Sequence, residues 1–150
     1  MIEDGTMTAN AVTTGVIVCE LDTGAEKSFM MEGTPCLTDE EPTHLSCSMA
    51  NGIPMQLKSK AVLRATYNGK TTNDMAMSSP TSLPVFVGKF ARNLLSGLQL
   101  VQMGYTIVLA PGQCYIADEH GNRYPVKQGP RSFTVEFTID AACKAGSAHN

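Results

Sequence analysis

Short apolar segments rich in β-branched residues, separated by turn dipeptides, recur along most of this chain. Gly, Asn and Pro are the residues that tight turns between strands favour, because they adopt or preset the backbone angles that such turns need. Apolar segments of a few residues bounded by such turns predict strands. The chain is therefore expected to be mainly β, with turns at Asn51-Gly52, Asn68-Gly69, Pro111-Gly112 and Gly121-Asn122.

Two of the expected strands have the clearest patterns. The segment 15–21 is a nearly continuous apolar run, and the segment 132–139 alternates apolar and polar residues, which predicts a half-buried strand. Pro84 lies near the start of the segment 83–87 and indicates an edge strand or a strand beginning, because proline cannot donate a ladder hydrogen bond. Further strands are expected at 45–49, 53–57, 61–67, 71–77, 105–109, 114–118 and 123–126.

One short helix is expected near residues 92–103. Leu94, Leu95, Leu98 and Val101 recur there at helical spacing, and Gly104 follows as a stop. The sequence thus predicts a single helix in an otherwise β chain.

The composition of the chain limits the classes of protein to which it can belong. A chain of 150 residues with 43% hydrophobic and 17% charged residues fits one globular domain. No apolar run is long enough to span a membrane, and the net charge of −3 argues against a dedicated nucleic-acid binder.

Charge is distributed unevenly along the chain. Residues 1–41 hold nine acidic residues and one basic residue, whereas residues 42–150 hold five acidic and ten basic residues. This asymmetry fits either chance clustering on solvated faces or a junction between segments of a longer polyprotein.

The five cysteines are odd in number, widely spaced and without a CxxC pair, so free thiols in a reducing compartment are expected. Cys36, His44 and Cys47 are close in sequence, but a zinc site would need a fourth ligand, and no metal is expected. A small zinc or redox module is kept as a less favoured alternative.

The motif that carries chemistry is Asp22-Thr23-Gly24-Ala25, directly after the first apolar strand. An aspartic protease holds two carboxylates so close that they share one proton, and the pair acts as general base and general acid. Gly24 permits a close backbone approach, and the Thr23 hydroxyl can hydrogen-bond across the turn and brace the pair of carboxylates. The alternative is an ordinary strand-ending turn, where Asp and Gly are common.

A second segment strengthens the first interpretation. With Asp22-Thr23-Gly24-Ala25 ahead of it, the stretch Arg92-Asn93-Leu94-Leu95-Ser96, followed by Gln99-Leu100 and Gly104-Tyr105, resembles the retropepsin family of aspartic proteases. The resemblance is closest to the protease segment of Copia-type retrotransposon Pol polyproteins. It covers about residues 15–126, and 112–116 resembles the start of the region that precedes integrase.

The resemblance implies a closed β-barrel half-enzyme that is active as a homodimer, with Asp22, Thr23 and Gly24 as catalytic residues. It implies a protease domain at 12–109, a β-hairpin segment at 110–140 and a disordered tail at 141–150. The expected substrate is the chain's own polyprotein, without any cofactor, membrane or direct nucleic-acid partner. The expected location is cytoplasmic, inside a virus-like particle if the enzyme is active.

The resemblance also implies a hairpin, or flap, that covers the substrate, expected at 53–64. This segment has no glycine, whereas retropepsin flaps usually carry glycines, and Ala91 replaces the usual glycine before Arg92. Arg92 is expected to be a structural brace, with a solvated helix-start residue as the alternative. A catalytically inactive retrotransposon-derived module for dimerisation or peptide binding is the alternative function. The expected substrate-binding residues are Ala25, Met55, Leu57, Ser59, Ala61 and Val87.

Overall fold

The computed structural model describes residues 15–48, 51–68 and 81–139. It confirms a mainly β chain. The only helix among the described residues is α2 (Gly97–Gln102). The strands are β1 (Val16–Asp22), β2 (Phe29–Met31), β3 (Leu37–Pro42), β4 (Ser46–Ser48), β5 (Pro54–Gln56), β6 (Ser59–Tyr67), β7 (Thr81–Gly88), β8 (Asn93–Ser96), β9 (Thr106–Ala110), β10 (Gln113–Ala117), β11 (Arg123–Pro125), β12 (Lys127–Gln128) and β13 (Phe133–Thr138).

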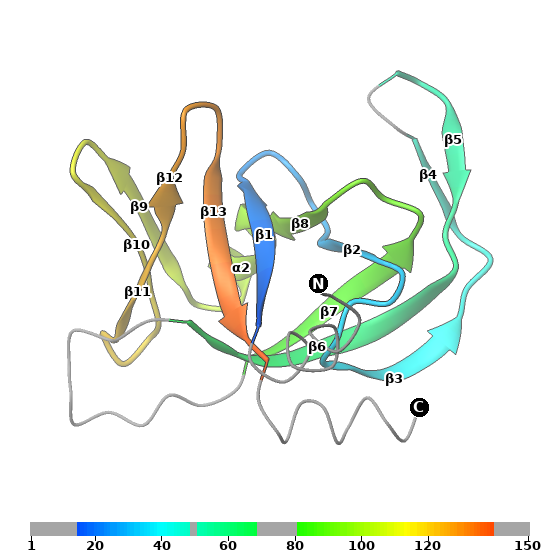
Figure 1. Ribbon diagram of the computed structural model, residues 1–150, viewed down its shortest axis with the longest axis horizontal. Helices are drawn as coiled ribbons and strands as arrows, with labels where there is room; N and C mark the ends of the chain where they lie inside the picture. Colours follow the sequence, from blue (N-terminus) through cyan, green and yellow to red (C-terminus); the bar gives the residue numbers. More distant parts are fainter. Residues whose placement is uncertain (1–14, 49–50, 69–80, 140–150) are drawn as a thin grey trace, which may run out of the picture.

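Six of these strands close into a barrel (Figure 1). The hydrogen-bonded order is β13-β1-β8-β2-β7-β6, and β6 returns to β13 through Tyr67 and Thr66. The β1–β8 and β2–β7 pairs are parallel, and the other pairs around the barrel are antiparallel. Closure leaves no open edge around the ring, so the predicted closed barrel is confirmed.

Alternating burial along the strands fills the barrel. On β6 the buried positions alternate with more exposed ones, and β13 turns Val135 and Phe137 inward. On β1, Cys19 is fully buried, and this burial raises the pKa of its thiol to about 12. The aromatic end of the core is built on Tyr67, whose ring stacks on Tyr124 at 4.5 Å between centroids.

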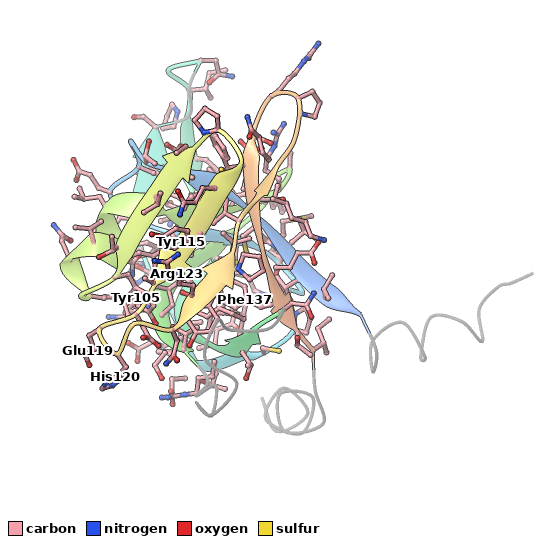
Figure 2. All side chains as sticks on the ribbon, turned by 90° about the vertical axis from the view of Figure 1, so that its left-hand side faces the viewer. Tyr105, Tyr115, Glu119, His120, Arg123 and Phe137 are labelled. Atoms are coloured by element: carbon pink, nitrogen blue, oxygen red, sulfur yellow. The ribbon has the colours of Figure 1, made fainter. Side chains whose placement is uncertain are left out.

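A three-stranded sheet and a separate hairpin accompany the barrel. The β9–β10–β11 sheet turns at Gly112 and Gly121, and the β4–β5 hairpin carries Gly52 in its turn; all three glycines have positive φ. These hairpins confirm three of the four predicted turns. Figure 2 shows Tyr115 and Arg123 together on the three-stranded sheet, with the Arg123 guanidinium carbon 4.2 Å from the Tyr115 ring centroid. The predicted turn at Asn68-Gly69, the strand at 71–77 and the tail at 141–150 extend outside the described residues.

The helix begins later in the structure than the sequence predicts. Residues 93–96 form β8, and α2 begins at Gly97. Because β8 lies between β1 and β2 in the barrel, its pairing overrides the helical periodicity of the leucines. The Ser96 hydroxyl then caps α2 by accepting the Gln99 N–H.

Pro84 lies within β7, where the strand pairs with β6 on one side. On the other side β2 pairs only with the segment 86–88, so Pro84 faces no strand there. The missing N–H therefore breaks no ladder hydrogen bond, and the predicted edge character is confirmed locally.

The barrel extends across the predicted domain boundary at residue 109. β13 lies in the segment 110–140, yet it pairs with β1 from Val16↔Thr138 to Leu21↔Phe133. The barrel therefore needs residues from both sides of the boundary.

Charged side chains bridge β3 and β6 on the surface. Asp39 pairs with Arg64 at 3.1 Å, and Glu41 pairs with Lys60 at the same distance. Exposed pairs of this kind contribute at most about 1 kcal/mol each. They place part of the acidic segment 1–41 against bases from later in the chain.

The expectation of free thiols throughout is wrong for one residue. Cys36 is disulfide-bonded, whereas the described residues Cys19, Cys47 and Cys114 are free. Over the described parts of the chain, no helix has the length and apolar character to cross a membrane.

Candidate active site

Asp22 is the last residue of β1 and is half-buried, and the chain turns directly after it through exposed Thr23 and Gly24. The Asp22 Oδ1 atom accepts the Gly24 N–H at 2.9 Å, and the Ala25 N–H donates to the Asp22 carbonyl at 3.4 Å. This local turn fixes the carboxylate, as Asp side chains commonly do in turns. The Oδ2 atom has no hydrogen-bond or ion-pair partner among the described residues.

The roles expected of Thr23 and Gly24 do not arise within one chain. The Thr23 hydroxyl makes no hydrogen bond to any described residue, so the predicted brace is not formed here. A Cβ at Gly24 would meet only Asp22 Oδ1, at 3.6 Å, which is ordinary van der Waals contact. A close approach that demands glycine at this position is therefore absent from the described single chain.

Parallel pairing of β1 with β8 brings together the two segments that carried the resemblance. In this register Asp22 lies opposite Ser96, although the two residues are far apart in sequence. The Asp22–Ala25 motif and the Arg92–Ser96 stretch are therefore neighbours in space, at the point where β8 continues into α2.

A buried serine pair supports the Asp22 turn from behind. The Ser96 Oγ–H donates to the Ala25 carbonyl at 2.5 Å, and the Ser28 Oγ accepts the Ser96 N–H at 2.9 Å. The Ser28 hydroxyl in turn donates to Gln99 Oε1 at 2.7 Å, and Gln99 Nε2 donates to the Pro84 carbonyl. Each such bond contributes about 1 kcal/mol, and a buried group left unpaired would cost more.

Neither Ser28 nor this function of Ser96 was predicted from the sequence. The spacing Ser96-x-x-Gln99 is a capping-box pattern and could have indicated Ser96 as an N-cap. In the structure Gln99 does not bond back to the Ser96 N–H, because Ser28 occupies that donor. No sequence pattern indicates Ser28, since its partners lie 68 and 71 residues away.

The structure divides the residues expected to bind substrate into an accessible group and a buried group. Ala25 and Met55 are half-buried and lie where a ligand could reach them. Four others have at most 3% of their surface exposed, so a peptide cannot contact them in this structure: Leu57, Ser59, Ala61 and Val87. Ala61 and Val87 belong to the hydrophobic core, and Ser59 donates to Glu40 Oε2 at 2.5 Å.

The expected flap at 53–64 is also misplaced. The projecting hairpin is β4–β5, which spans 46–56 and extends away from the barrel in Figure 1. The second half of the predicted flap is β6, a strand of the barrel wall. The turn of the actual hairpin contains Gly52 at φ 83°, so the hairpin does not lack glycine.

Arg92 bonds across the start of β8. Its Nη1 atom lies 2.7 Å from Glu20 Oε2 on β1, which agrees with a brace between these two segments. The Arg92 side chain is 65% exposed, and an ion pair so open to water contributes little to stability.

The described residues do not support the alternative of a zinc site. No group of three or more His, Cys, Asp and Glu side chains there could hold a metal ion. Cys36, which the zinc alternative requires, is disulfide-bonded.

Comparisons of the chain with known protein families, with curated proteins and with solved structures found no match.

Proposed function

We propose that this chain is a retropepsin-type aspartic endopeptidase, active as a homodimer, that processes a Copia-type retrotransposon polyprotein. The observation that carries the proposal is the Asp22-Thr23-Gly24 turn, which ends a barrel strand and lies beside the Arg92–Ser96 stretch. The hydrogen bond from Ser96 to Ala25 links the two segments.

The mechanism needs two Asp22 carboxylates, one from each chain. Two carboxylates a few ångströms apart cannot both ionise, so the pair shares one proton. The ionised group takes a proton from a water molecule, whose oxygen attacks the scissile carbonyl. The protonated group donates to the developing oxyanion, and a proton then reaches the leaving amine as the C–N bond breaks. The Gly24 N–H holds Oδ1 through these steps, and Oδ2 faces the water.

Substrate would be covered by the β4–β5 hairpin. Leu45 and Ile53, at its base and tip, are 55% and 60% exposed. An extended peptide lying between this hairpin and the Asp22 turn would cover such side chains and exclude water from the reacting bond.

The test is cleavage of a peptide library by the purified full chain at mildly acidic pH. Asp22→Asn is expected to reduce cleavage by several orders of magnitude, because a neutral amide cannot accept the proton from water. The matched control is Glu26→Gln, which removes an exposed carboxylate four residues along the chain and is expected to cleave normally. Equal cleavage by Asp22→Asn and the wild type, or no cleavage by any form, would contradict the proposal.

A second candidate is a catalytically inactive module for peptide binding or dimerisation. The burial of four expected substrate contacts favours loss of catalysis, because an endopeptidase needs such contacts to position the scissile bond. Peptide binding in the same library without cleavage, unchanged by Asp22→Asn, would identify the second candidate.

A further inference from the structure

A chain of hydrogen bonds connects β7 with the turn after β1 through the side chains of Gln99 and Ser28. Gln99 Nε2 donates to the Pro84 carbonyl at 2.8 Å, and Gln99 Oε1 accepts the Ser28 hydroxyl at 2.7 Å. Ser28 Oγ accepts the Ser96 N–H at 2.9 Å, and the Ser96 hydroxyl donates to the Ala25 carbonyl. We call this path, from Pro84 to Ala25, the Gln99 relay.

The direction of every bond in the Gln99 relay is fixed by one carbonyl group. A carbonyl oxygen can only accept, so the amide nitrogen of Gln99 must face Pro84. The amide oxygen of Gln99 is then left to accept the hydroxyl hydrogen of Ser28. With its hydrogen engaged, the Ser28 oxygen presents its lone pairs to the Ser96 N–H. The relay therefore has a single arrangement of donors and acceptors, and it starts on β7.

The middle of the relay is shielded from water. Ser28 and Ser96 are 1% and 0% exposed, and the Ser28 carbonyl also accepts the Phe86 N–H at 3.0 Å. Water has little access at such a depth, so leaving one of these groups unpaired costs more free energy than the bond itself contributes. Linked bonds in a low-dielectric interior also polarise and strengthen one another. The relay is therefore expected to hold the groups at its ends in one position.

The relay ends on the residue that closes the Asp22 turn. The Ala25 N–H donates to the Asp22 carbonyl at 3.4 Å, which is long for such a bond, whereas the Ser96 hydroxyl holds the Ala25 carbonyl at 2.5 Å. The position of Ala25 therefore depends more on Ser96 than on the turn itself. Gly24, the residue before Ala25, donates its N–H to Asp22 Oδ1 at 2.9 Å, so a displaced Ala25 moves the group that fixes the carboxylate.

We propose that Gln99 and Ser28 are positioning residues for the Asp22 carboxylate. Both act through Ser96 and Ala25, and neither side chain bonds to Asp22 itself. Proton transfer depends on the placement of the reacting groups, and a misplacement of about 1 Å can cost about 100-fold in rate. Loss of the relay is therefore expected to lower kcat and to leave KM nearly unchanged. The effect on kcat rests on the proposed function, whereas the position of the turn is measured without cleavage.

Amide hydrogen exchange, followed by NMR in the full chain, tests the positioning. In Ser28→Ala and in Gln99→Ala, the amides of residues 24–25 are expected to exchange about fivefold faster than in the wild type, which is the effect of about one lost hydrogen bond. Gln99 is half-buried and lies outside the hydrophobic core, so Gln99→Ala remains informative if Ser28→Ala fails to fold. Unchanged exchange at residues 24–25 in a folded Gln99→Ala variant would overturn the inference.

The matched control for these variants is Thr138→Ala. It removes a hydroxyl that donates to Asn68 at 3.0 Å, at the end of β1 opposite to Asp22, because Thr138 pairs with Val16. The variant loses a hydrogen bond of the same kind, so its overall stability is expected to fall, but exchange at residues 24–25 should match the wild type. A control that also accelerates this exchange would show that any loss of stability loosens the turn, and would remove the relay as the cause.

Gln99→Glu provides a measurement that a merely structural role would not affect. The ionised carboxylate at position 99 can still accept from Ser28 but cannot donate to the Pro84 carbonyl, whereas the protonated carboxyl group can do both. The relay should therefore be intact below the ordinary glutamic acid pKa of about 4.3 and lost above it. The kcat of Gln99→Glu relative to the wild type is expected to fall about tenfold as the pH rises through this range, with KM nearly unchanged.

The two proposals can fail separately. A wild type that never cleaves peptides, with faster exchange at residues 24–25 in Gln99→Ala, would remove the enzyme and leave the relay as the support of the turn. Asp22-dependent cleavage with the same kcat in the wild type, Ser28→Ala and Gln99→Ala would leave the enzyme and overturn the role of the two positioning residues.

Discussion

At the scale of single residues, Asp118 shows how one carboxylate can organise a turn. Its oxygens accept the N–H groups of His120 and Asn122, the Asn122 amide and the Tyr124 hydroxyl, all within 3.0 Å. Partial burial acts to raise the pKa of Asp118, but the bonds from Asn122, Tyr124 and His120 outweigh it and lower the pKa below its ordinary 3.8. Folding therefore favours the ionised carboxylate.

This shift predicts a pH-dependent stability. Asp118→Ala should lower the free energy of unfolding at pH 7 by about 2 kcal/mol, because it removes bonds to a charged acceptor. The stability that the Asp118 carboxylate contributes is fully present above the pKa that this group has in the unfolded chain. It is lost as pH falls through the lower pKa of the group in the folded protein. The difference in unfolding free energy between the wild type and Asp118→Ala should therefore narrow below about pH 4. Urea unfolding at pH 7 and pH 3 measures both values. Glu119→Ala, at the exposed neighbouring residue, is the control and should have little effect; a difference independent of pH would refute the role of the charge.

At the scale of elements, the junction between the Asp22 turn and α2 depends on the absence of a side chain at Gly97. Alanine is favoured over glycine by up to about 1 kcal/mol in a helix. A Cβ at Gly97 would nevertheless lie 3.0 Å from Thr23 Cα, a backbone atom that cannot move without displacing the turn. Gly97→Ala is therefore expected to destabilise the protein by about 1–2 kcal/mol and to reduce any Asp22-dependent cleavage.

Thermal unfolding and the peptide assay measure the two effects of Gly97→Ala. Gln102→Ala, at an exposed position of the same helix, serves as control and should be neutral or slightly stabilising. If Gly97→Ala proved as stable and as active as Gln102→Ala, the close packing of the turn against α2 would have no consequence.

The elements also show which features the sequence could reveal. Hairpins at Gly52, Gly112 and Gly121 were predictable, because local turn chemistry decides them. Strand β8 was not predictable, because its leucines fit a helical pattern and only pairing with β1, which is distant in sequence, makes this segment a strand. The Asp22 turn was recognisable from its residues, whereas Ser28 was not, because its hydrogen bonds depend on the tertiary fold.

At the scale of the whole molecule, the barrel predicts that no fragment ending at residue 109 folds. Such a fragment lacks β13, which pairs with six residues of β1 and closes the ring onto β6. It would expose the apolar face of β1 and two strand edges. The fragment 1–109 is expected to lack a cooperative unfolding transition by circular dichroism, in contrast to the full chain. Cooperative unfolding of the fragment would show that the first 109 residues form an independent domain.

The pairing of Val16 with Thr138 has a consequence for biosynthesis. A ribosome adding about 5–20 residues per second needs on the order of ten seconds to pass from β1 to β13. Throughout that interval the inward side chains of β1 have no β13 to cover them, and β8 also appears only late in the interval. The nascent chain is therefore a natural client for chaperones that bind apolar segments, and this dependence should end once residue 138 has left the exit tunnel.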